Sequence, residues 1–240
     1  MRIAVVSDIH ANLTALEAVI ADLRLASPDL VVQGGDLIAG GTRPAEVIDC
    51  VRALGWPGVY GNADEMLWRP DRLDETLGAP QFDTMRRMLQ THTIPENLAT
   101  IGDERLAWLR SLPVRWDAEA IAVVHAGTDN VWQSPGVSAS DEELAAAYAV
   151  LGAGTVVFGH IHHAFVRRLP TMTVANAGSV SLPFDGDARA AYLLVDGDRI
   201  EIRRVAYDVE AEVALLQKSR DPFASSTIQT LRTARYAPGS

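Results

Sequence analysis

The chain has 240 residues, of which 48% are hydrophobic, and a formal net charge of −10 at pH 7. This length suits one domain with a sizeable core, and the acidic balance argues against broad electrostatic binding to nucleic acid. The single cysteine, Cys50, excludes an internal disulfide and a cysteine-based zinc cluster. Because no apolar run resembles a signal peptide or a membrane span, we expect a soluble, cytoplasmic protein.

Short apolar runs rich in β-branched residues predict a series of buried strands. They cover residues 3–6, 30–32, 59–60, 121–124, 155–158 and 172–175. Between the first two, apolar residues at helical spacing predict a helix over 13–23, with Asn12 as its N-cap. A second helical pattern covers 46–54 and makes Cys50 a packed core residue. The first half therefore reads β-α-β-α-β, which is typical of a layered α/β core.

Residues 66–113 interrupt this series of strands. Apolar residues recur at helical spacing within 82–89 and within 106–112, which predicts a helical insertion or small cap over the active site.

The last part of the chain changes character. Two runs that favour strands, 191–195 and 199–205, flank Asp196-Gly197-Asp198, and this pattern predicts a hairpin. It implies a mixed sheet or a second sheet. Another helix is expected over 209–216, whereas residues 219–240 are polar and aperiodic and predict a loosely held tail. We expect one domain over 1–240.

Five short segments carry side chains that bind divalent metals, and most of them follow a predicted strand. They are Ser7-Asp8-Ile9-His10, Gly34-Gly35-Asp36, Gly61-Asn62-Ala63-Asp64, Val124-His125 and Gly159-His160-Ile161-His162. Groups placed after strands gather at one edge of an open α/β sheet. Mixed oxygen and imidazole donors suit Mn, Fe, Zn, Co or Ni better than Ca or Mg. The set predicts metal-assisted hydrolysis, for which a phosphate ester is the usual target of a paired site.

Each motif taken alone has a structural explanation. Asp36 could cap a helix, and Asn62 could simply form a turn. His160 and His162, two residues apart, could share one face of a strand without a metal. The whole set, in order and after strands, favours a dinuclear metal site, in which the two oxygens of Asp36 could bridge the ions.

The ordered motifs resemble the calcineurin-like metallophosphoesterase superfamily, especially its small bacterial and archaeal phosphodiesterases. The resemblance runs from residue 7 to about residue 181 and includes Asn176-Ala177-Gly178-Ser179. It implies an α/β fold built as a four-layer αββα sandwich, in which two mixed β-sheets are flanked by helices. It also implies two bound divalent ions, for which Mn²⁺ is the first choice and Fe, Zn, Ni or Co are alternatives.

The resemblance further implies which side chains hold each ion. The first would be held by Asp8, His10, Asp36 and His162, and the second by Asp36, Asn62, His125 and His160. Two cations about 3.5–4 Å apart lower the pKa of a bridging water and supply hydroxide as the nucleophile. They also offset charge during in-line displacement at the phosphate. Asp36, Asn62 and His125 thereby gain a catalytic role as ligands.

One position departs from the family pattern. Many relatives have a histidine, thought to protonate the leaving group, where this chain has Ala63. Because losing a general acid costs roughly 10²–10⁴ in rate, we expect a preference for aryl esters or anhydrides. His163, Asp129 and His92 are candidates for a replacement acid, although both histidines are also explained as surface or packing residues. Asp64, without its usual partner, is either structural or holds a metal-bound water.

Several functions are compatible with these motifs. A phosphodiesterase is the leading hypothesis, and a phosphomonoesterase or a dinucleoside polyphosphate hydrolase are the nearest alternatives. A non-catalytic scaffold is disfavoured because all seven ligands are present, and a nuclease is disfavoured by the acidic balance. Asn12, Arg43 and Ser179 are candidate contacts to a small phosphate-ester substrate. We expect no membrane or nucleic-acid partner, with a homodimer as the default assembly.

Overall fold

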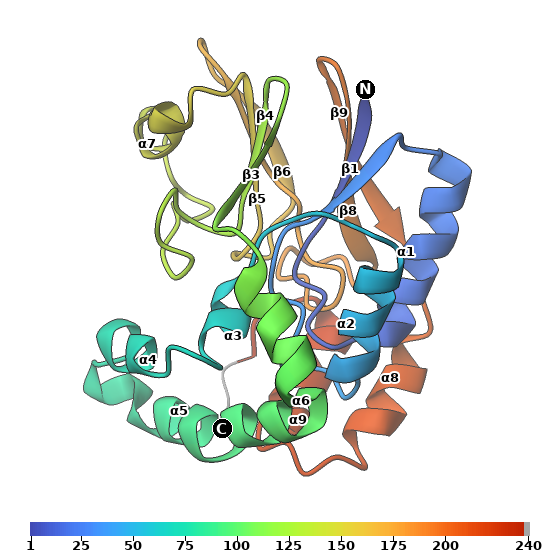
Figure 1. Ribbon diagram of the computed structural model, residues 1–240, viewed down its shortest axis with the longest axis vertical. Helices are drawn as coiled ribbons and strands as arrows, with labels where there is room; N and C mark the ends of the chain where they lie inside the picture. Colours follow the sequence, from blue (N-terminus) through green and yellow to red (C-terminus); the bar gives the residue numbers. More distant parts are fainter. Residues whose placement is uncertain (238–240) are drawn as a thin grey trace.

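The computed structural model describes residues 1–237 and contains two β-sheets that lie face to face (Figure 1). The strands of the first sheet, in spatial order, are β2 (Leu30–Gln33), β1 (Arg2–Val6), β8 (Ala190–Asp196) and β9 (Arg199–Val205). Those of the second are β3 (Arg115–Ala118), β4 (Ile121–Val124), β5 (Thr155–Phe158), β7 (Thr173–Asn176) and β6 (Phe165–Arg168). Both sheets are mixed, since each combines parallel with antiparallel pairs.

Alternating residues of β1 contribute to two different hydrophobic cores, one on each face of the strand. Ile3 and Val5 face the second sheet, where they meet Val157 of β5. Ala4 and Val6 point the other way and join the core beneath the helices. This alternation follows from the two-residue period of a strand, and full burial of each large apolar side chain contributes about 1.5–3 kcal/mol.

Helices cover the outer faces of both sheets (Figure 1). On the first sheet, α1 (Leu13–Ala26) and α2 (Pro44–Ala53) enclose the helix-side core. The N-cap of α1 is Asn12, as predicted, because its Oδ1 accepts the N–H of Ala15 at 2.9 Å. On the second sheet, α7 (Asp141–Tyr148) packs Tyr148 against Phe158 of β5. These layers confirm the predicted αββα sandwich.

Helices also fill the segment that was expected to form an insertion. They are α4 (Asp71–Thr76), α5 (Asp83–Met88) and α6 (Ile94–Ser111), and the short helix α3 (Asn62–Glu65) comes directly before the segment. A short 3₁₀ turn (Pro80–Phe82) precedes α5, and a π-helical stretch (Leu89–Thr93) joins it to α6. Helix α6 is interrupted at Gly102, whose φ of 69° only glycine adopts without strain. These helices lie beyond one end of the strands of both sheets (Figure 1).

The strand expected over 59–60 does not form. Only an isolated parallel bridge joins Gln33 to Gly58. Beyond it the Tyr60 N–H donates to the carbonyl of Pro113, and the chain then enters α3. The pairing stops because the next residues, beginning at Gly61, turn towards Asp36.

The tail expected to be loose over 219–240 is a second correction. Helix α9 (Ala224–Thr233) forms there and packs on α8 (Val209–Leu216), with Leu231 only 1% exposed. Its buried face consists of Leu231 together with Thr227 and Thr230, so the apolar periodicity is weak in the sequence. Residues 238–240 lie outside the described part of the chain.

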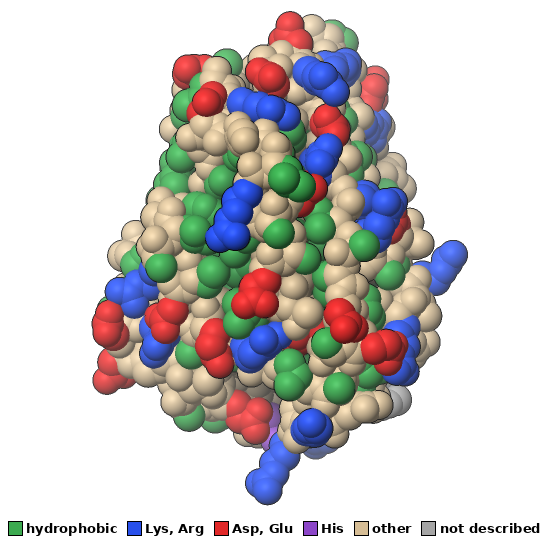
Figure 2. Space-filling view, turned by 90° about the vertical axis from the view of Figure 1, so that its right-hand side faces the viewer, with side chains coloured by type: hydrophobic (Ala, Val, Ile, Leu, Met, Phe, Trp, Pro, Cys, Tyr) green, Lys and Arg blue, Asp and Glu red, His purple; other side chains and the backbone are tan. Residues whose placement is uncertain are grey.

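Two further expectations, a hairpin near the C-terminus and a packed cysteine, agree with the structure. Strands β8 and β9 form the predicted hairpin around Gly197, and Cys50 packs, half-buried, against the helix-side core. Over residues 1–237, no helix combines the length and apolarity needed to cross a lipid bilayer. On the face shown in Figure 2, basic and acidic side chains are interspersed rather than gathered in a basic stripe.

Candidate metal centre

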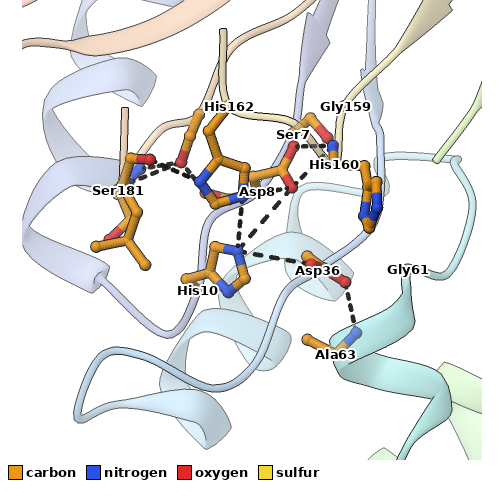
Figure 3. A network of polar contacts seen from close by, with 12 residues as sticks. Ser7, Asp8, His10, Asp36, Gly61, Ala63, Gly159, His160, His162 and Ser181 are labelled. Carbon is orange, nitrogen blue, oxygen red and sulfur yellow. Dashed lines mark hydrogen bonds and ion pairs between the residues drawn. The ribbon is translucent and has the colours of Figure 1, made fainter. Parts of the chain in front are cut away.

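The predicted metal-binding side chains converge where the strands of the two sheets end, and Figure 3 shows Asp8, His10, Asp36, His160 and His162 of this set. Asp8 and His10 follow β1, and Asp36 follows β2 of the same sheet. From the second sheet, His125 follows β4, and His160 and His162 follow β5; Asn62 begins α3. The convergence results from the parallel pairs β1–β2 and β4–β5, whose carboxyl ends point the same way.

The backbone at most of these positions is left-handed, a conformation that side-chain-bearing residues adopt reluctantly. Five of the seven predicted ligands have φ between 48° and 66°, namely Asp8, His10, Asp36, His160 and His162. Each such residue costs on the order of 1–3 kcal/mol and persists only where the surroundings enforce it. Here the N–H of His10 donates to the carbonyl of Asp36 at 2.9 Å, and that of Asp8 to Gly35 at 3.0 Å. The strained loops direct the side chains towards one another.

One half of the centre combines two imidazoles with two carboxylates. The Nε2 atoms of His10 and His162 lie 3.2 Å apart. His162 Nε2 is 3.1 Å from Asp8 Oδ1, and His10 Nε2 is 3.5 Å from Asp36 Oδ2. All four side chains are buried. Asp8, His10 and His162 could therefore hold one metal ion.

The other half brings together an amide oxygen and two further imidazoles. Asn62 Oδ1 lies 3.0 Å from His125 Nε2 and 2.8 Å from His160 Nδ1. His125 Nε2 is also 3.5 Å from Asp36 Oδ1. The two oxygens of Asp36 thus face different halves of the centre, as a bridging carboxylate requires.

The histidine tautomers test whether these residues fit a cation. Three imidazoles place Nδ1 against a backbone carbonyl oxygen: His10 against Ala39 at 3.2 Å, His125 against Gly34 at 2.9 Å and His162 against Leu182 at 2.6 Å. A carbonyl can only accept a hydrogen bond, so each Nδ1 carries a proton, and the lone pair of the neutral ring is then on Nε2. These lone pairs point at each other and at carboxylate or amide oxygens. Such a convergence of acceptors fits divalent cations, with the carbonyls orienting the rings.

Burial sets the charge of the centre. It lowers the pKa of His10 to about 4, with the charge of His162 adding to the effect, and lowers that of His160 to about 3. Both imidazoles are therefore neutral donors at pH 7. Burial also raises the pKa of Asp36 to about 7; the charge of Asp8 adds to the shift and that of His125 opposes it. Cation binding at Asp36 is therefore coupled to proton release.

Asp64 has a structural role, which is one of the two roles considered for it. Its carboxylate is fully buried and accepts the N–H groups of Asp36, Gly61 and Leu37 at 2.9–3.0 Å. The N–H of Ala63 in turn donates to Asp36 Oδ1 at 2.8 Å. Asp64 therefore fixes the loop that carries Asp36 without contacting the cluster of donor atoms.

Two glycines are required by close approach to the carboxylates. A Cβ atom on Gly61 would lie 2.1 Å from Asp36 Oδ1, and one on Gly159 would lie 2.3 Å from Asp8 Oδ2. Any other residue at either position would displace a carboxylate of the centre. The sequence shows both glycines, but only the structure shows which atoms they make room for.

The three predicted substrate contacts interact with other parts of the protein in this structure. Asn12 and Ser179 are fully buried, and the hydroxyl of Ser179 donates to the carbonyl of Asp8 at 2.8 Å. Arg43 pairs with the buried carboxylate of Glu212 on α8 at 2.9 Å. A buried carboxylate requires a cationic partner, and the guanidinium of Arg43 supplies it here. Contact of these three residues with a phosphate stays a prediction.

A cavity of about 500 Å³ opens onto the donor atoms, with His10, Asn62, His160 and His162 in its wall. Ala63 also lines it, at the position where many relatives have histidine. None of the three candidate replacement acids, His163, Asp129 and His92, is among its described lining residues. A role for any of the three as a replacement acid stays a prediction, which the lining of the cavity does not support.

Sequence reasoning missed Phe184, which stacks on the imidazole of His162 with ring centroids 4.5 Å apart and planes 23° apart. Tyr236, beyond α9, packs edge-on against Phe184. Phe184 lies in a segment without regular periodicity, so no local pattern marks it as part of the centre.

The chain is similar in sequence to known proteins. Residues 1–199 match the sequence model of the calcineurin-like phosphoesterase superfamily domain. An uncharacterised protein of Methanocaldococcus jannaschii is 28% identical over 246 aligned positions, which cover 92% of this chain and 93% of the relative.

Two solved structures extend over nearly the whole chain. A metallophosphoesterase from Sphaerobacter thermophilus superposes with a TM-score of 0.78 at 25% identity, covering 98% of this chain and 99% of its own. A hypothetical protein from Pyrococcus horikoshii superposes with a TM-score of 0.82 at 18% identity, covering 97% and 98% of the two chains.

Proposed function

The chain belongs to the calcineurin-like phosphoesterase superfamily, and we propose that it is a dinuclear metal-dependent phosphodiesterase. The observation that carries the proposal is the pair of donor groups that share Asp36, in which imidazole Nε2 atoms face carboxylate and amide oxygens. When bound, the two ions supply an activated water for in-line attack and offset the charge on the phosphate oxygens. We propose Mn²⁺ as the first choice of ion, with Fe, Zn, Ni or Co as alternatives.

The protein's own residues prepare the site for this chemistry. Asp8, His10, Asp36 and His162 are proposed to hold one ion, and Asp36, Asn62, His125 and His160 the other. The backbone carbonyls behind three of the imidazoles keep the rings in the metal-binding tautomer. Asp64 and Gly61 fix the loop of Asp36, and Ala63 lines the cavity without offering the proton that a histidine would supply at this position.

A diester is favoured over a monoester by the charge of the site. A monoester carries more negative charge than a diester and is best bound where cationic side chains supplement the metals. Arg43, the predicted candidate for this role, is engaged by Glu212, and no Lys or Arg side chain is among the described residues lining the cavity. A phosphomonoesterase and a dinucleoside polyphosphate hydrolase are the alternative activities.

The test compares hydrolysis of bis-p-nitrophenyl phosphate and p-nitrophenyl phosphate in Mn²⁺, with Asp36→Ala as the control. We expect diester cleavage that depends on the metal and falls at least 10³-fold in Asp36→Ala. Cleavage of the monoester alone would favour the phosphomonoesterase. Absence of turnover on both diester and monoester, with two metal equivalents bound per chain, would favour a metal-bearing scaffold.

A further inference from the structure

The cavity in front of the metal centre has a composition that restricts the substrate. Its volume of about 500 Å³ is that of a pocket for a drug-sized ligand, well beyond what a bare phosphate needs. One end is formed by the proposed metal ligands, and the remainder comes largely from residues 66–93 and 221–237. Any group attached to a phosphate on the metals therefore has room within this cavity.

Apolar side chains dominate this remainder. They include Leu73, Leu77, Met85, Leu89, Phe184 and Phe223. Met85 and Leu89 belong to α5 and the π-helical stretch that follows it, and both are half-buried, so part of each side chain stays accessible. Removing an apolar group from water against such surface stabilises a complex by about 25 cal/mol per Å².

The charges of the lining exclude a second phosphate. Among the described residues around the cavity there is no Lys or Arg, and the carboxylate found there outside the metal centre is that of Asp221. A phosphate away from the metals would need guanidinium or ammonium donors to replace its hydration. In this cavity it would meet apolar surface, serine and threonine hydroxyls and the acidic Asp221, with no cationic side chain among the described lining residues to offset its charge.

We propose that the substrate is a phosphate ester with a single phosphate group and a bulky, uncharged, apolar organic group that occupies this cavity. The inference rests on the proposed function, because it assumes that the proposed metal ligands hold the phosphate. It narrows the phosphodiester class and argues against dinucleoside polyphosphates and oligonucleotides.

Binding tests the proposal without turnover. Titration calorimetry on the Mn²⁺-loaded protein compares phenylphosphonate with methylphosphonate, which present the same headgroup and differ in the organic group. We expect phenylphosphonate to bind at least tenfold more tightly, because the ring is withdrawn from water. Equal affinities would overturn the proposal, whether or not the protein hydrolyses diesters.

Kinetics distinguish this inference from the proposed function. Four substrates are compared, and each releases p-nitrophenolate. Two are methyl p-nitrophenyl phosphate (the methyl diester) and phenyl p-nitrophenyl phosphate (the phenyl diester). The other two carry a p-nitrophenyl ester on the 5′-phosphate of thymidine 5′-phosphate or of thymidine 3′,5′-bisphosphate. We expect the phenyl diester to have a KM at least tenfold below that of the methyl diester, and the bisphosphate to be at least tenfold poorer in kcat/KM than the monophosphate. Equal turnover of the methyl and phenyl diesters would leave the enzyme assignment intact and overturn the apolar preference. Absence of turnover on every diester would instead overturn the phosphodiesterase.

A charge placed in the cavity gives a matched pair of variants. Met85 lines the cavity, whereas Met88, on the same helix and equally half-buried, is absent from its lining. Met85→Arg should weaken phenylphosphonate binding at least tenfold and improve kcat/KM for the bisphosphate, and Met88→Arg should change neither. If both variants behaved alike with unchanged thermal midpoints, the cavity would not be the binding site and the proposal would fall.

Discussion

At the scale of single residues, the position of the proposed bridging carboxylate depends on a neighbour outside the donor cluster. Asp64 accepts backbone N–H groups from both the Asp36 loop and the Gly61 turn. Hydrogen bonds to a buried charge contribute about 1.5–3 kcal/mol each, and an unsatisfied partner costs a similar amount. The hydrogen bonds of Asp64 therefore link the stability of these two loops to the position of Asp36.

Asp64→Asn tests this coupling. The amide nitrogen would face N–H donors in place of an acceptor, so we expect the free energy of unfolding to fall by about 2–4 kcal/mol. Urea denaturation of the metal-free protein measures the change. Asp71→Asn, at an exposed carboxylate that pairs with Arg69, is the control and should stay within about 0.5 kcal/mol of the parent. A loss below 1 kcal/mol in Asp64→Asn would show that these hydrogen bonds are dispensable.

We expect Ala63 to restrict which leaving groups the site can expel. The residue lines the cavity beside Asn62, and the described cavity wall contains none of the candidate replacement acids. Introducing a proton donor by Ala63→His should raise kcat/KM towards dialkyl phosphates by about 10²-fold, while p-nitrophenyl esters, whose leaving group is stable as an anion, should change little. Ala63→Phe fills similar space without a proton and should not show the gain. Equal effects of His and Phe would refute a proton-transfer explanation.

The proposed metal ligands are easier to predict from the sequence than the substrate contacts. Asp8 and His10 stand out because chemistry-bearing residues follow a recognisable strand, and the structure brings them to one edge with Asp36. Arg43 has no such context: its partner, Glu212, is 169 residues away in a helix whose placement no local pattern reveals. Phe184 is hidden for the same reason.

At the scale of elements, the strands buried on both faces are predictable because their apolar runs are continuous, as in β1, β4 and β5. The run at 59–60 fails because two apolar residues cannot form a ladder once Gly61 turns into α3. Helix α9 is missed because its buried positions include two threonines, whose methyl groups pack while their hydroxyls read as polar.

The C-terminal helix is anchored by one large side chain. Leu231 is buried against Val213 and Leu216 of α8, so Leu231→Ala leaves a cavity and should cost about 2–4 kcal/mol of unfolding free energy. Because α9 also contributes to the wall of the cavity, Leu231→Ala should also raise the KM for the phenyl diester. Gln229→Ala, at an exposed position of the same helix, is the control. A change below about 0.5 kcal/mol in Leu231→Ala would mean that α9 detaches freely.

At the scale of the whole molecule, the proposed metal centre joins the two sheets. Asp8, His10 and Asp36 come from loops of the first sheet, and His125, His160 and His162 from loops of the second. The sheets also share an apolar core, so the centre adds to an interface that exists without it. Binding to the native state alone stabilises by mass action, by about 2.7 kcal/mol at a concentration one hundred times Kd.

Removing the ions should therefore lower the thermal midpoint of the entire protein. Converging lone pairs and left-handed loops store unfavourable energy that bound cations offset, so treatment with a chelator is expected to reduce Tm by about 5–10 °C for a chain of this length. Calorimetric scans before chelation, after it and after Mn²⁺ is restored measure the shift. Asp36→Ala provides the internal comparison: with the shared carboxylate gone, its midpoint should respond to neither chelator nor Mn²⁺. A parent protein whose midpoint ignores both would contradict a metal centre between the sheets.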